Sequence, residues 1–115
     1  MANTFKVVTK AGVTSADVIY TAGSGVTAIV LGLILGITTT SQITSTVTLT
    51  SDTSSRAGAN DEANQAVELI TDAPIPAGSS LELLSGNKVV LETTDTISVT
   101  GSGATDVALS IMEIT

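Results

Sequence analysis

A nearly uninterrupted apolar run from Val26 to Ile37 (VTAIVLGLILGI) constrains this chain most, because the remaining residues must cover it. As a helix it would extend roughly 18 Å, well short of a hydrocarbon core of roughly 30 Å, so a membrane span is not expected. A shorter helix would contain Gly32 and Gly36 in G-x-x-x-G spacing, and each glycine costs about 1 kcal/mol relative to alanine. The run therefore predicts a strand, with a helix as the less favoured alternative.

Taken as a strand, the run sorts its side chains onto two faces. The first face is bulky and is the expected domain core: Ile29, Leu31, Leu33, Leu35 and Ile37. The second is apolar but thin, and it consists of Val26, Ala28, Val30, Gly32, Ile34 and Gly36. Glycines in a strand often mark close approach by another backbone, so valine at Gly32 or Gly36 is expected to disturb packing more than valine at Thr27. This second face is either inside the domain or a candidate interface with a subunit or partner.

Size and composition predict one domain spanning residues 1–115. A chain of 115 residues falls within the usual range for a single core, and 43% of its residues are hydrophobic. Phe5 and Tyr20 are its only aromatic residues. The core must therefore be filled with aliphatic and β-branched side chains.

The charge of the chain argues against nucleic acid as a partner. The formal net charge is −7, and the cations are Lys6, Lys10, Arg56 and Lys88, whereas a nucleic-acid surface needs clustered cations. Anionic membranes would be repelled as well. The N-terminal residues MANTFKVVTK also lack the basic and apolar regions of a signal peptide.

The remaining strands are short and closely spaced. Asp17–Thr21 is rich in β-branched residues, and in Gln42–Thr50 every second residue from Thr44 onward is threonine while the residues that alternate with them are Ile43, Ser45, Val47 and Leu49. Further strands are expected at Phe5–Thr9, Ala66–Thr71, Leu81–Leu91 (a hairpin around Gly86-Asn87), Ile97–Val99 and Val107–Ile114. Breaks are expected at Ala11-Gly12 and at the proline-containing Asp72–Gly78, with the longest loop at Ser51–Ala63.

This pattern predicts an all-β fold: an antiparallel β-sandwich or jelly-roll-like single domain of about eight strands. A closed barrel remains an alternative. No internal repeat or linker divides the chain.

No catalytic or cofactor motif occurs in the context that its chemistry requires. Gly23–Ala28 fits G-x-G-x-x-A, but a dinucleotide site requires a helix after the glycines, and a strand is expected there. Asp52, Asp61 and Glu62 could supply oxygen ligands to calcium, but their spacing matches no EF-hand loop. The chain contains neither cysteine nor histidine, so thiolate chemistry, disulfides and the commonest general base are all absent. No catalytic, cofactor-binding or metal-binding residue is therefore expected, and the chain is not expected to be an enzyme.

Several segments resemble small virion structural proteins of tailed bacteriophages, especially phages of aquatic bacteria. In the N-terminal half, Ile19–Ala22 and Thr27–Gly32 carry the similarity. In the C-terminal half it is carried by Asp72–Leu81, Gly86–Glu92, Asp95–Thr100 and Asp106–Ile114. The segment Ser51–Asn64 departs from the family pattern.

The resemblance implies a β-sandwich component of the virion, assembled in the host cytoplasm, with no active site. It favours a capsid decoration (cement) protein that binds the major capsid protein, as a homo-oligomer. The alternatives are a tail, neck or fibre-associated protein and, less favoured, a cell-surface carbohydrate-binding module. The scarcity of aromatic rings weighs against the last, because sugar sites tend to use aromatic platforms.

Overall fold

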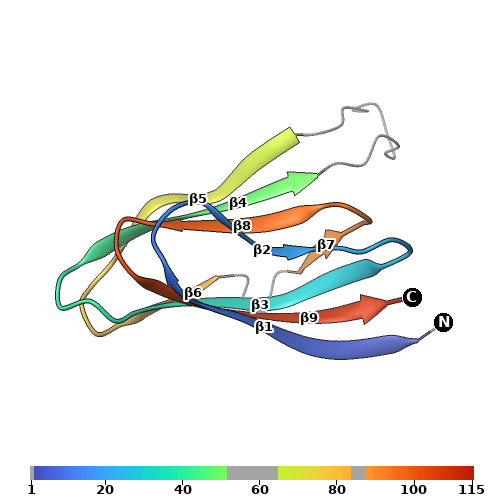
Figure 1. The fold of residues 1–115 in the computed structure, drawn as a ribbon, viewed down its shortest axis with the longest axis horizontal. Coiled ribbons are helices and arrows are strands. Elements are labelled where there is room, and N and C mark those ends of the chain that lie inside the picture. The colour runs from blue at the N-terminus through green and yellow to red at the C-terminus, as the bar shows by residue number, and fades with distance from the viewer. Residues whose placement is uncertain (1, 52–64, 84–87) are drawn as a thin grey trace.

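In the computed structural model, which describes residues 2–51, 65–83 and 88–115, the chain is an all-β sandwich of two antiparallel sheets (Figure 1). The first sheet contains, in spatial order, β1 (Asn3–Val13), β9 (Thr105–Ile114) and β3 (Thr27–Ile37), with β6 (Ser80–Leu83) and β7 (Val89–Leu91) on the far side of β3. The second sheet runs β2 (Asp17–Thr21), β8 (Thr96–Gly101), β4 (Ile43–Ser51) and β5 (Gln65–Ile75). The predicted all-β sandwich is confirmed.

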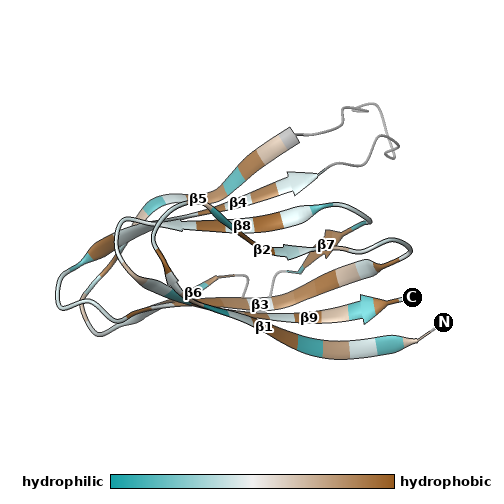
Figure 2. Ribbon diagram, in the orientation of Figure 1, coloured by the Kyte–Doolittle hydropathy of each residue, from teal (hydrophilic) through white to brown (hydrophobic). Residues whose placement is uncertain are grey.

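The core between the sheets is aliphatic, as the scarcity of rings requires. Strands of both sheets carry hydrophobic residues (Figure 2). Every second residue along the inner strands is buried, which is the period expected of strands with one face against the core. The largest fully buried aliphatic side chains are Val30, Leu33, Leu35, Leu91, Leu109 and Ile111 from the first sheet, and Val47, Ile75, Ile97 and Val99 from the second. Tyr20 only packs against this cluster, and Phe5 lies outside it.

A β-bulge in β3 corrects the two faces predicted for the central run. Val30 lies opposite Ile111 of β9 but Gly32 lies opposite Ser110, so Leu31 is an extra residue in β3. An extra residue reverses the side on which later side chains point. The buried face of β3 therefore changes parity in mid-strand, and it consists of Ala28, Val30, Leu33, Leu35 and Ile37.

The hairpin predicted over Leu81–Leu91 is wrong. β6 and β7 both pair antiparallel with β3, β6 alongside Leu33–Gly36 and β7 alongside Ala28–Val30. They thus follow one another along the same side of β3. The expected turn residues, Gly86 and Asn87, lie outside the described residues.

Two strands continue through residues that were expected to end them. β1 continues past Ala11-Gly12 because a register shift there, with Gly12 at a φ of 69°, returns Val13 to a position opposite Thr105. β5 continues through Asp72, at a φ of 48°, to Pro74. Proline is tolerated there because β5 is an edge strand of its sheet.

Candidate functional site

The outward side of the first sheet is apolar, and this surface is the candidate functional site. Residues directly opposite one another in a sheet share a face, so the register assembles rows across the strands. One row runs Phe5, Met112, Ile29 and Val90, and another runs Thr9, Ala108, Ile34 and, at its far end, Glu82. We call this surface the apolar face and define it by Phe5, Val7, Ile29, Ile34, Val90, Ala108 and Met112.

Exposure within the apolar face is high for such side chains. The exposed fractions are 71% for Phe5, 64% for Val7, 55% for Val90 and 45% for Ile34. Elsewhere in the described chain, Val18 and Val67 are the large hydrophobic side chains that are exposed, and they lie on strands of the second sheet. Exposed apolar side chains gathered on one sheet are typical of an interaction surface.

The bulge divides the interface candidates of the central run between the core and this face. Ala28 and Val30 are fully buried, so they belong to the core and their assignment to an interface is wrong. Gly32, Ile34 and Gly36 lie on the outward side, where an interface remains a prediction.

Val26 is half-buried and lies before β3, where its N–H donates to the carbonyl of Gly23. Conversely, Ile29 and Leu31 of the expected core face are only partly buried.

The close approach expected at Gly32 and Gly36 is absent. A Cβ atom built on either residue meets no atom within 4 Å among the described residues, so the expectation that valine there disturbs packing is wrong for the isolated chain. Close approach occurs instead at Gly101, where such a Cβ would lie 2.7 Å from the carbonyl oxygen of Gly103 and 2.9 Å from that of Val13.

Because Gly32 and Gly36 lack side chains, two hollows flank Ile34 on the apolar face. The larger, of about 360 Å³, is lined by Thr9, Lys10, Ala11, Ile34, Gly36, Asp106, Val107 and Ala108. The smaller, of about 180 Å³, is bounded by Gly32, Ile34, Glu82 and their neighbours on β3, β6 and β9. The larger hollow reaches β1 at the edge of the sheet, and its lining is mainly apolar.

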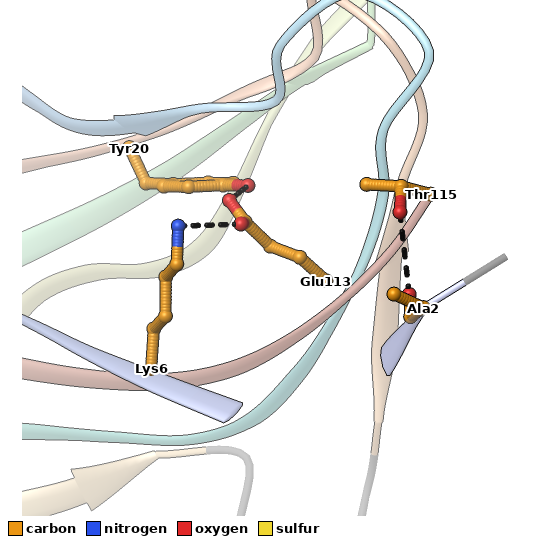
Figure 3. Close-up of polar contacts among 5 residues, drawn as sticks. All are labelled: Ala2, Lys6, Tyr20, Glu113 and Thr115. Carbon is orange, nitrogen blue, oxygen red and sulfur yellow. Dashed lines mark hydrogen bonds and ion pairs between the residues drawn. The ribbon is translucent and has the colours of Figure 1, made fainter. Parts of the chain in front are cut away.

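A polar contact ties this sheet to the second one (Figure 3). Tyr20 of β2 donates its hydroxyl hydrogen to Glu113 Oε2 at 2.6 Å, and Lys6 Nζ lies 2.8 Å from Glu113 Oε1. The Lys6 ammonium and then the Tyr20 hydroxyl hold the pKa of Glu113 below its ordinary value, while burial and the neighbouring carboxylate raise the pKa of Tyr20. Both shifts favour an ionised Glu113 and a neutral Tyr20 at neutral pH.

The outward side of the second sheet is rich in hydroxyl side chains, although the exposed Val18 of β2 lies on it opposite Ser98. Threonine and serine pair across β4 and β8 as Thr46–Thr100, Thr48–Ser98 and Thr50–Thr96. We call this surface the threonine face. The side chains in these pairs are polar, and Thr46 Oγ1 accepts the N–H of Asp72 at 3.0 Å, so the paired rows do not have the character of an apolar interface.

Other chemistry considered from the sequence finds little support. Gly23–Ala28 leads into strand β3 rather than a helix, so a phosphate cradle at a helix N-terminus is not formed. Asp52, Asp61 and Glu62 lie outside the described residues. Among the residues that are described, no group of three or more carboxylate, histidine or cysteine side chains is placed to hold a metal ion. No helix in that part of the chain is long and apolar enough for a membrane crossing.

Comparison with known proteins leaves the chain without a family. No protein-family model matches it, and no curated protein matches it. A solved structure described by the words "Bacillus endospore appendages form a novel family of disulfide-linked pili" is similar over 97% of this chain and 84% of that chain, with 16% identity and a TM-score of 0.48. A similarity this distant says nothing about function.

Sequence reasoning missed Phe5 and Val7, the most exposed members of the apolar face. The sequence predicts a strand over Phe5–Thr9, but the alternation of a strand does not say which of its two sides is covered. The pairing of β1 with β9 decides this, because it places Phe5 in the same row as Met112 and Ile29.

Proposed function

We propose that this chain is a non-enzymatic structural protein of a bacteriophage virion, a capsid decoration protein that binds the major capsid protein. The observation that carries the assembly role is the apolar face. A sandwich with one apolar and one threonine-rich outer face is suited to attach by the first and to expose the second. The virion assignment rests on the resemblance of the strand and turn segments to tailed-phage structural proteins.

Charge and chemistry agree with an outer position. An acidic chain with four cations among 115 residues avoids packaged nucleic acid, and its described residues offer no metal cluster for catalysis. A carbohydrate-binding module is less favoured, because the only ring on the apolar face is Phe5 at the sheet edge. A tail, neck or fibre protein shares the assembly role but would occur at one place in the particle.

Binding to capsids tests this proposal. Purified chain is mixed with capsids built from the major capsid protein of the same phage, and co-sedimentation and electron cryomicroscopy are used to determine its location and copy number. A copy number that scales with that of the capsid protein is expected. Density confined to the portal or tail, or signals on a glycan array without capsid binding, would overturn the decoration role.

A pair of charge substitutions tests which face is used. Ile34→Lys places a cation in the middle of the apolar face, and Thr48→Lys places the same cation on the threonine face. Capsid binding should fall about tenfold or more for Ile34→Lys, because a lysine buried in an apolar contact must be desolvated. Thr48→Lys should bind like the unaltered chain. The opposite pattern would assign binding to the threonine face.

A further inference from the structure

We propose that β1 is a dimerisation edge, at which two copies of this chain pair antiparallel about a two-fold axis through Val7, with Phe5 of each copy seated in the larger hollow of the other. This inference builds on the proposed assembly function and names a second copy as the partner of the same face. It rests on four properties of the edge: its unpaired backbone, its side chains, the position of the hollow and its charge.

The backbone of β1 is available along one side. In the described chain β1 pairs with β9 and has no strand on its other side (Figure 1). Thr115 N–H donates to the Ala2 carbonyl at 3.0 Å, and hydrogen-bonded pairs alternate along an antiparallel ladder. Thr4, Lys6 and Val8 therefore bond to β9, while Phe5, Val7 and Thr9 direct their N–H and C=O groups to the open side. An unpaired edge of this length is a template for another strand.

The same alternation puts the free backbone and the exposed side chains on the same residues. Phe5 and Val7 are 71% and 64% exposed and belong to the apolar face. A second β1 paired about Val7 would place Phe5 opposite Thr9 of the other copy. The apolar face would then continue across the axis without interruption, so strand pairing and apolar contact would reinforce one another.

In this register the Phe5 ring of the second copy would lie beside the larger hollow. Thr9 and Ala11 form its rim on β1, and Ile34, Gly36 and Ala108 line it behind that rim. Phe5 of the second copy, opposite Thr9 and on the same face, would reach across Thr9 toward Ala108. The volume of about 360 Å³ is ample for one phenyl ring. By symmetry both rings are received, which makes the interface self-complementary.

Charge repulsion disfavours pairing at the other sheet edges and in the neighbouring registers. The molecule carries −7, and copies repel wherever acidic residues face one another, as Glu68 and Asp72 would at β5 and Glu82 at β6. Residues 1–16 contain no acidic residue, and their cations are neutralised internally: Lys6 by Glu113 at 2.8 Å and Lys10 by Asp17 at 3.6 Å. Pairing about Val7 sets Lys6 against Val8 and Lys10 against Thr4, whereas the neighbouring registers set Lys6 against Lys6 or Lys10.

Cysteine cross-linking tests the register directly, because the chain has no cysteine of its own. In the Val7→Cys variant the two Cα atoms would lie about 5.5 Å apart across the axis, within the disulfide range of about 4.4–6.8 Å. In the matched Phe5→Cys variant they would lie about 14 Å apart, since four residues along the strand and the spacing between the two strands separate them. Mild oxidation at micromolar concentration should give a covalent dimer with Val7→Cys and none with Phe5→Cys. Cross-linking of both, of Phe5→Cys alone or of neither would overturn the proposal.

Sedimentation of the intact chain tests the contribution of the ring. The unaltered chain should be dimeric at micromolar concentration, and Phe5→Ala should weaken the dimer about tenfold or more. Val67→Ala removes a 50% exposed side chain from the edge strand of the other sheet and should leave the dimer intact. A monomeric unaltered chain, or equal effects of the two substitutions, would overturn the pairing.

The pairing and the proposed function fail separately. A chain that stays monomeric yet decorates capsids would remove the β1 dimer and leave the capsid role. A chain that dimerises through Val7 but does not bind capsids would leave the dimer and remove the decoration role.

Discussion

The two outer faces of this sandwich carry opposite chemistry although both belong to antiparallel sheets of similar size. On the first sheet the outward rows hold Phe5, Met112, Ile29 and Val90, and two glycines leave hollows around Ile34. On the second sheet they hold threonine and serine in opposed pairs, with Val18 at the end of one row. Both sheets bury equivalent aliphatic rows on their inner sides. Stability therefore comes from the inner faces, and the outer faces are free to differ according to what each must contact.

Deleting Ile34 should have the largest effect, because it removes one residue from β3 after the bulge and reverses the side on which the following residues point. Leu35 and Ile37 would then leave the core. We expect a loss of more than about 4 kcal/mol in the free energy of unfolding, measured by urea denaturation. Deleting Leu31 is the control and should cost much less, because it removes only the extra residue of the bulge, and regular alternation then leaves the same side chains inside. Equal stability of the two deletion variants would show that the bulge does not set the faces.

Valine substitutions at Gly101 and Gly36 should show the next largest difference in stability, because Gly101 is enclosed and Gly36 faces open space. Gly101→Val drives a side chain into Thr105 and the carbonyls of Gly103 and Val13, so a loss of about 3 kcal/mol or more is expected in thermal or urea unfolding. Gly36→Val enters open space in a strand and should change stability by less than about 1 kcal/mol, in the stabilising direction. It should nevertheless weaken self-association, because it fills the larger hollow. A destabilised Gly36→Val monomer would contradict the open outer face.

Glu113→Gln should weaken the polar contact between the sheets. At neutral pH we expect a loss of about 1–2 kcal/mol, because hydrogen bonds to a charged group are replaced by weaker neutral ones. Since the pKa of Glu113 is lowered in the folded state, its contribution is present above the ordinary carboxyl pKa of 4.5 and is lost as pH falls through the lowered value.

Urea unfolding from neutrality to about pH 3 checks this dependence. The difference in the free energy of unfolding between the unaltered chain and Glu113→Gln should decrease toward acid pH. Tyr20→Phe is the control, because it removes one hydrogen bond but keeps the ion pair of Lys6 with Glu113. A gap independent of pH would mean that the charge of Glu113 contributes nothing.

Thr48→Val should have the smallest effect and tests the threonine face. The substitution exchanges a hydroxyl for a methyl group at a half-buried outward position, so stability should change by less than about 0.5 kcal/mol. Sedimentation should show the same oligomeric state as the unaltered chain. A new, larger assembly would show that the hydroxyl row prevents association through that side.

Much of the fold could be predicted from local pattern. The alternation in Gln42–Thr50 and the β-branched content of Asp17–Thr21 correspond to β4 and β2, and the apolar run became β3. The hairpin over Leu81–Leu91 failed, because alternation in β6 and β7 is equally compatible with two segments that follow one another along β3. The predicted ends of the strands at Gly12 and Pro74 are wrong, because bulges and edge positions allow a strand to continue through residues that usually end it.

Three properties follow from the sequence alone: one side of Val26–Ile37 is covered, the core is aliphatic, and catalytic residue types are scarce. These follow from composition and from the fixed alternation of a strand. Which side of Val26–Ile37 is covered at each position depends on contacts between strands. One extra residue opposite β9 sends Ala28 and Val30 inward and leaves Gly32, Ile34 and Gly36 outside. A bulge depends on the neighbouring strand, so no period read along the chain can locate it.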